Sequence, residues 1–189
     1  MKYADLEVTR FADEMAQRRI PSPAAGSSLA VSLIMACSLL EMTVAEAEEK
    51  GKAPAGRQPG EDREQIQSWR EEGKRLIDAD IQAVEKMLRE KGNGNPQELL
   101  APVLRLHRLA VEAVETARDY LVFSGPKVSD TFTAFLHLRT VAAGAYHIAC
   151  FNETFYDWKH PLPRDFGELL EGWDREAARA LRETGDSVR

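Results

Sequence analysis

Asp80 is a carboxylate within an apolar stripe, which makes it the residue of this chain best suited to chemistry. Residues 66–88 carry apolar side chains at three- and four-residue steps, the spacing of an amphipathic helix. The stripe consists of Ile66, Trp69, Gly73, Ile77, Val84 and Leu88. At about 100° per residue, Asp80 falls in the middle of this stripe, and charged residues such as Lys74 and Glu85 fall opposite. The pattern therefore predicts a carboxylate that points toward the core.

A carboxylate in that position must be paired, hydrogen-bonded or protonated, because its desolvation alone costs several kcal/mol. Such groups are candidates for proton transfer. Two structural alternatives stay open at this point. Asp80 could cap a neighbouring helix, or it could pair with a buried arginine.

Two serine-bearing loops precede apolar helices and could hold an anionic ligand. Residues 21–28 end in Gly26, Ser27 and Ser28, and residues 125–130 end in Ser129 and Asp130. Free N–H groups at a helix start attract anions, hydroxyls add donors, and a glycine lets a ligand approach the backbone. Alternatively, the serines are N-caps, and the aspartate in a first helical turn suits the helix dipole.

The composition is that of an ordinary globular domain, here a single domain over residues 1–189. Hydrophobic residues make up 43% and charged residues 30% of the chain, and the net charge is −6. No dense lysine and arginine run with interleaved aromatic residues suggests a nucleic-acid surface. The four histidines form no i,i+4 pair, and CxxC and HExxH motifs are lacking, so we expect no metal site.

The cysteines favour a reducing compartment. Cys37 and Cys150 lie in apolar helical runs and resemble small buried hydrophobes, so we expect a cytoplasmic protein that makes no membrane contact. Residues 20–40 carry no charge and follow Arg18 and Arg19, which leaves an export signal or a membrane anchor as an alternative. Prolines, a glycine and serines interrupt this run, and its apolar part, residues 29–40, is too short to span about 30 Å of hydrocarbon.

The elements that must position these residues are helices. No stretch alternates apolar and polar residues between turn residues. Helices are predicted over residues 3–18, 28–50, 61–91, 96–124, 129–153 and 163–183, with a Gly- and Pro-rich linker over 51–60. In the first helix Leu6, Phe11 and Met15 should face inward. We therefore predict an all-α protein, a multi-helix bundle of five to six helices.

Two of the predicted helices, residues 28–50 and 129–153, are nearly uncharged over much of their length. A helix that is apolar on all faces must be covered all round, so these two should be the central helices. Both are rich in alanine, serine and glycine, which permit close helix contacts. A chain of 189 residues has little material to cover both, and we therefore expect a homodimer.

Several motifs, taken in order, resemble one known family. They are Phe11 ahead of Pro21-Ser22-Pro23-Ala24-Ala25-Gly26-Ser27, Asp80-Ile81-Gln82-Ala83-Val84, an early helical Pro102, Ser129-Asp130, and a helix with Gly144-Ala145 and Phe151-Asn152. This order is similar to the cyclodeaminase/cyclohydrolase family, which includes methenyltetrahydrofolate cyclohydrolases and the cyclodeaminase half of formiminotransferase-cyclodeaminase. Each motif is weak alone, but together they cover nearly the whole chain.

The resemblance implies an all-α bundle, a dimer and a cleft for a tetrahydrofolate derivative, with Asp80 near the reacting carbon. The chain departs from the family pattern at three places. Ala24 and Ala25 replace two glycines, Ile148 and Ala149 replace Asn-Val, and residues 124–127 replace a Gly-Asn turn. The departures bear on which ligand is bound and whether the family's activity is retained.

The leading hypothesis is a hydrolase of one-carbon metabolism that converts 5,10-methenyltetrahydrofolate to 10-formyltetrahydrofolate. Asp80 would stabilise the cationic substrate and accept a proton from the attacking water. The start of the second helix, at Gly26, Ser27 and Ser28, would hold a polar part of the folate. The predicted binding residues also include Ser129, Asp130, Arg139 and Asn152.

Arg139 could pair with Asp80, with a folate carboxylate or with a structural acid. Two other functions stay open. A cyclodeaminase would release ammonia from formiminotetrahydrofolate and would need a proton donor to the leaving amine. A non-catalytic helical dimer would bind a small molecule or a partner protein.

Overall fold

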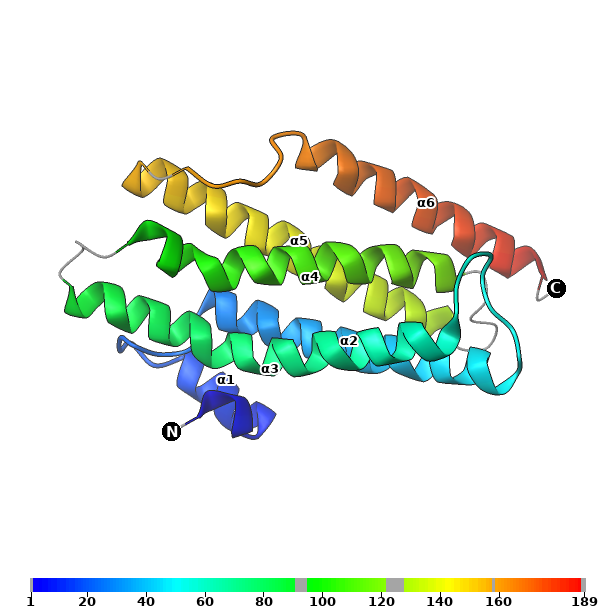
Figure 1. The fold of residues 1–189 in the computed structure, drawn as a ribbon, viewed down its shortest axis with the longest axis horizontal. Helices are drawn as coiled ribbons and strands as arrows, with labels where there is room; N and C mark the ends of the chain where they lie inside the picture. The colour runs from blue at the N-terminus through cyan, green and yellow to red at the C-terminus, as the bar shows by residue number, and fades with distance from the viewer. Residues whose placement is uncertain (1, 91–94, 122–127, 158, 188–189) are drawn as a thin grey trace.

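The computed structural model describes residues 2–90, 95–121, 128–157 and 159–187, with side chains as far as residue 183. Within these ranges every regular element is helical, which confirms the prediction of an all-α, multi-helix bundle (Figure 1). The elements are the 3₁₀ helix η1 (Tyr3–Asp5) and the α-helices α1 (Val8–Met15), α2 (Ala25–Glu49), α3 (Pro59–Arg89), α4 (Pro96–Leu121), α5 (Val128–Tyr156) and α6 (Phe166–Ser187).

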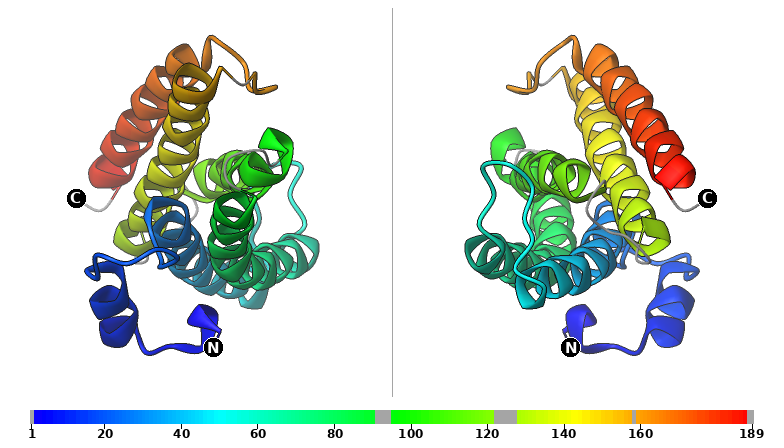
Figure 2. Two further views of the ribbon diagram at one scale, coloured as in Figure 1. Left: turned by 90° about the vertical axis from the view of Figure 1, so that its left-hand side faces the viewer. Right: turned by 90° about the vertical axis from the view of Figure 1, so that its right-hand side faces the viewer.

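The four long helices α2 to α5 form the bundle, and α6 lies on its outside (Figures 1 and 2). α2 packs against α3 and α5, and α4 packs against the same two helices from the other side. α6 rests on α4 and α5. The fully buried Trp173 fixes it there, because its indole N–H donates to Glu115 of α4 over 2.8 Å.

The two nearly uncharged helices, α2 and α5, contact each other through small and polar side chains. Thr43 Oγ1 of α2 lies 2.7 Å from Thr131 Oγ1 of α5. Toward the other end of the pair, a Cβ atom on Gly144 would lie 2.9 Å from Leu29 Cδ1, so this glycine allows the close approach. The two contacts show that α2 and α5 run antiparallel.

α2 also has an apolar strip that is partly exposed in the described part of the chain. Met35 and Met42 are 49% and 37% exposed, and their seven-residue separation puts them on one side of the helix. By length and composition alone, α2 is the one described helix that could cross a membrane, a test that the core helix of a soluble protein also passes.

The N-terminal segment differs from its prediction. A continuous helix over residues 3–18 was expected, but η1 and α1 are separate and Leu6 between them is extended. The Tyr3 backbone N–H donates to Asp78 Oδ1 of α3 (2.8 Å), which ties η1 to the bundle and turns the chain before α1 begins. Phe11 is buried as predicted, whereas Met15 is exposed.

Candidate functional site

The carboxylate of Asp80 lies against the first turn of α2. The Ser27 backbone N–H donates to Asp80 Oδ2 over 3.0 Å, and the Ser27 hydroxyl donates to the same oxygen over 2.8 Å. Ser27 is fully buried, and Asp80 is half-buried. The inward direction predicted from the stripe on α3 is therefore confirmed.

Gly26 makes this approach possible. A Cβ atom built on Gly26 would lie 2.6 Å from Asp80 Cγ and 2.8 Å from Oδ2, closer than any side chain tolerates. The sequence had suggested that this glycine lets a ligand approach the backbone. In the folded chain the group that approaches is the carboxylate of α3.

Asp80 also caps α2, one of the two structural alternatives left open by the sequence. The helix begins at Ala25, and its N-cap residue Ala24 makes no side-chain hydrogen bond, so neither Ser27 nor Ser28 is the N-cap. Ser27 lies within the first turn, where its free N–H meets an acceptor from another helix. The positive end of the α2 dipole also favours a negative charge at this point.

Burial raises the pKa of the Asp80 carboxyl above its ordinary value, while the two hydrogen bonds from Ser27 act in the opposite direction. The described residues form no ion pair with Asp80. A carboxyl group with a raised pKa and no fixed cation can take up and release a proton nearer to neutrality. The arrangement is therefore suited to general acid–base chemistry.

The other predicted site residues do not all gather around Asp80. Because α2 and α5 are antiparallel, Thr131 lies beside Thr43, and ~24 Å of helix separates that level from Ser27. Ser129 and Asp130 are therefore at the opposite end of α2 from Asp80 within one chain. The part of their loop at residues 125–127 lies outside the described residues.

Arg139 pairs with an acid of α6. Its Nε and Nη2 atoms donate to Asp174 Oδ1 and Oδ2 over 2.5 and 2.6 Å, so of the three predicted partners the structural acid is the one present. Asn152 lies near the end of α5 that is level with the start of α2, and its amide donates to the Ile148 carbonyl in the preceding turn (2.8 Å).

A second polar cluster, around His107 and His160, was not predicted. His160 Nδ1 accepts a hydrogen bond from the Leu162 N–H (3.2 Å), and its Nε2 lies 3.5 Å from Cys150 Sγ and 3.6 Å from Glu153 Oε2. Histidines four residues apart are a local signal that this chain lacks, whereas these residues meet only where the chain folds back after α5. Among the described residues no three His, Cys, Asp or Glu side chains form a group that could hold a metal ion.

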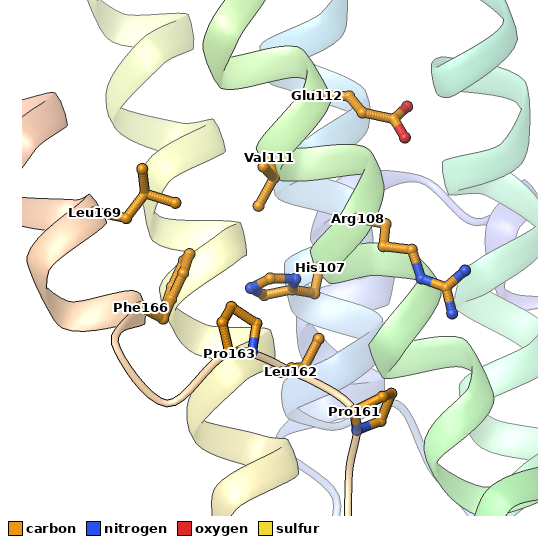
Figure 3. Close-up of a pocket in the computed structure, with 9 residues that line it drawn as sticks. All are labelled: His107, Arg108, Val111, Glu112, Pro161, Leu162, Pro163, Phe166 and Leu169. Atoms are coloured by element: carbon orange, nitrogen blue, oxygen red, sulfur yellow. The ribbon is translucent and has the colours of Figure 1, made fainter.

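A mostly apolar cleft lies beside His107 and not beside Asp80. It has a volume of about 410 Å³ and lies between α4 and the segment 161–169 (Figure 3). None of the clefts described in the single chain includes Asp80 in its wall. In the single chain a substrate would reach the Asp80 carboxylate through the part of the side chain that is exposed to solvent.

The chain matches no protein-family model and no curated protein. In architecture it is similar to formiminotetrahydrofolate cyclodeaminase from Thermotoga maritima. The two superpose with a TM-score of 0.58 over 96% of this chain and 95% of the other, at 20% sequence identity. At 20% sequence identity this similarity shows that the two proteins share a fold over nearly the whole of both chains.

Proposed function

We propose that the protein is a folate one-carbon enzyme of the cyclodeaminase type. It would close 5-formiminotetrahydrofolate to 5,10-methenyltetrahydrofolate and release ammonia. The observation that carries the proposal is the half-buried Asp80 carboxyl, held at the start of α2 by Ser27 and raised in pKa by burial. The shared fold with a formiminotetrahydrofolate cyclodeaminase supports ring closure with ammonia release over hydrolysis of the methenyl product.

The reaction needs one group that both accepts and donates a proton. N10 of the folate attacks the carbon of the protonated formimino group, and a C–N10 bond forms. The proton lost by N10 passes to Asp80, which then donates it to the amino group on the same carbon. The C–NH₃⁺ bond breaks, its electron pair leaves with ammonia, and the remaining cation is shared between N5 and N10. A carboxyl group with a raised pKa suits the donation to the leaving amine.

The serine that holds Asp80 would set its direction. Both hydrogen bonds from Ser27 end on Oδ2, so Oδ1, which lies against Gly26, is the oxygen whose hydrogen-bonding capacity is left for the substrate. The lack of an ion-pair partner among the described residues leaves the charge of Asp80 available to the cationic formimino group.

A second copy of the chain would complete the site. α2, which carries Ser27, also carries the partly exposed strip of Met35 and Met42. A homodimer formed on this strip would cover the apolar surface and add a wall near the start of α2. Light scattering would report the dimer. The double change Met35→Glu and Met42→Glu should give a monomer with reduced turnover, whereas a monomeric parent protein would remove the dimer from the proposal.

The experiment that tests the reaction supplies each substrate in turn to the purified protein. With 5-formiminotetrahydrofolate, ammonia and the methenyl product should form in equal amounts and faster than in buffer. Consumption of methenyltetrahydrofolate alone would instead assign the hydrolase reaction. Loss of neither compound above the buffer rate would overturn an enzymatic role and favour a non-catalytic helical protein.

A further inference from the structure

The cleft beside His107 is separate from the proposed folate site. Its walls come from α4 and from the segment 161–169, while Gly26, Ser27 and Asp80 belong to α2 and α3 (Figure 3). With a volume of about 410 Å³ it lies in the usual range of small-molecule sites. Its walls are mostly apolar, with Val111 and Phe166 on two sides.

His107 is the unusual polar group of this cleft. The side chain is only 4% exposed, and neither ring nitrogen has a hydrogen-bond partner among the described residues. Its ring meets Phe166 edge to face, with 4.7 Å between the ring centroids. Burial, together with repulsion from His160 and Arg108, lowers the pKa of His107 to about 4. At neutral pH it is therefore a neutral imidazole that offers one N–H donor and one acceptor.

Two opposite charges stand at the mouth of the cleft. Arg108 and Glu112 lie one helical turn apart on α4, and both line the cleft on the side away from Phe166 (Figure 3). Within the described part of the chain, neither side chain forms an ion pair or a hydrogen bond. Ion pairs along a helix are weaker when the basic residue precedes the acidic one by four residues. Arg108 and Glu112 have this order, so both charged groups are available to a ligand.

We infer that this cleft binds a free aromatic amino acid whose ring carries an N–H or O–H group, such as tryptophan or tyrosine. The carboxylate of the ligand meets Arg108 and its ammonium group meets Glu112. The ring enters the apolar space against Phe166, and its N–H or O–H group bonds His107. Each unpaired polar group of the cleft thereby gains a partner, and the zwitterion matches two opposite charges set one helical turn apart.

Calorimetric titration of the whole protein with L-tryptophan and L-tyrosine tests the inference. Both should bind with one site per chain, and L-phenylalanine should bind about tenfold more weakly because it leaves His107 unpaired. Tryptamine and indole-3-propionate, which each lack one charge, should also lose about tenfold or more in affinity. Nitrogen NMR of the imidazole should report a new hydrogen bond at His107 when L-tryptophan is added.

Variants at the exposed mouth of the cleft keep the test independent of folding. Arg108→Gln and Glu112→Gln should each weaken L-tryptophan binding by about tenfold, while the remote Arg75→Gln and the folate-site Asp80→Asn should leave it unchanged. Absence of heat at millimolar amino acid would overturn the inference. So would equal binding of tryptamine, or binding that survives both mouth substitutions. Because Asp80→Asn affects only the folate site, failure of one proposal is distinguishable from failure of the other.

Discussion

Asp80 is half-buried and His107 is buried, and the two ionisable side chains are held in opposite ways. Asp80 accepts two hydrogen bonds from Ser27 and lines none of the clefts described above. His107 adjoins a cleft of about 410 Å³ and has no hydrogen-bond partner there. Burial shifts both pKa values toward the neutral form, so that of Asp80 rises and that of His107 falls.

The difference indicates what each place can do. A carboxyl group fixed by directional bonds keeps one orientation, which proton transfer to a substrate requires. An imidazole held only by packing has bonding capacity to spare, which a ligand can use. The first place is therefore organised for a reaction, and the second for binding.

The largest effect is expected at the fixed carboxylate. Asp80→Asn should lower the rate of ammonia release by about 10²–10⁴-fold, because the amide cannot shuttle a proton. The amide oxygen still accepts from Ser27, and a desolvated charge is removed, so thermal unfolding at neutral pH should occur at the same or a higher temperature. Asp78→Asn, on another side of α3, is the matched control and should keep turnover. Full turnover in Asp80→Asn would assign the residue a purely structural role.

The close approach of Asp80 to α2 can be broken sterically. Gly26→Ala should cost about 1–3 kcal/mol of unfolding free energy, because its Cβ atom overlaps the carboxylate and forces it away. Gly172→Ala is the control, because nothing lies within 4 Å of its Cβ position. Alanine there should raise the unfolding free energy by up to about 1 kcal/mol, since it favours a helix more than glycine does. Urea unfolding of both variants gives the comparison, and equal stability changes at the two positions would contradict the packing.

The unpartnered histidine should make the fold sensitive to acid. The folded pKa of His107, about 4, is below its ordinary value of 6.5. Between these values the unfolded chain binds a proton that the folded chain refuses, so unfolding free energy falls as pH drops from 6.5 to 4. Above pH 6.5 this group contributes no slope.

His107→Leu removes that dependence. In this variant the unfolding free energy should fall less steeply between pH 6.5 and 4. At pH 7 it should be higher by up to about 1 kcal/mol, because no buried polar atom is left unpaired. The exposed His147 serves as the control position, where His147→Leu should keep the slope. Unfolding followed at several pH values measures both. An unchanged slope in His107→Leu would show that the ring is already charged or bonded in the folded protein.

The smallest effect concerns the ion pair on the outside of the bundle. Arg139→Gln should cost about 0.2–1 kcal/mol, because Arg139 and Asp174 form a partly exposed pair. Turnover should stay at the parent level, since the pair is not near Asp80. A large loss of turnover without a loss of stability would instead support the predicted role of Arg139 in folate binding.

The sequence predicted the helices and the inward carboxylate well, because both follow from local spacing. The α3 stripe places Asp80 inward, and the predicted start of the second helix at residue 28 misses α2 by three residues. The miss has a physical cause, since Asp80 supplies from another helix the cap that was sought in Ser27 or Ser28.

What the sequence could not give was the pairing of elements far apart in the chain. Ser129 and Asp130 were grouped with Ser27 because both loops precede apolar helices, but the antiparallel packing of α2 and α5 puts them at opposite ends. His107 has no histidine four residues away, so the sequence pattern assigned it no role. Only the fold-back after α5, which brings Leu162 and Phe166 over it, creates the cleft.

The protonation of Asp80 itself is the most direct test of the account. Carbon NMR of the aspartate carboxyl groups, with Asp80→Asn used to assign the signal, gives its titration midpoint. We predict a midpoint above the ordinary value of 3.8, and a further rise in Ser27→Ala, which loses the hydroxyl bond that favours the charged form. A midpoint at or below 3.8, or one that Ser27→Ala does not raise, would contradict a half-buried carboxyl group that is ready to carry a proton.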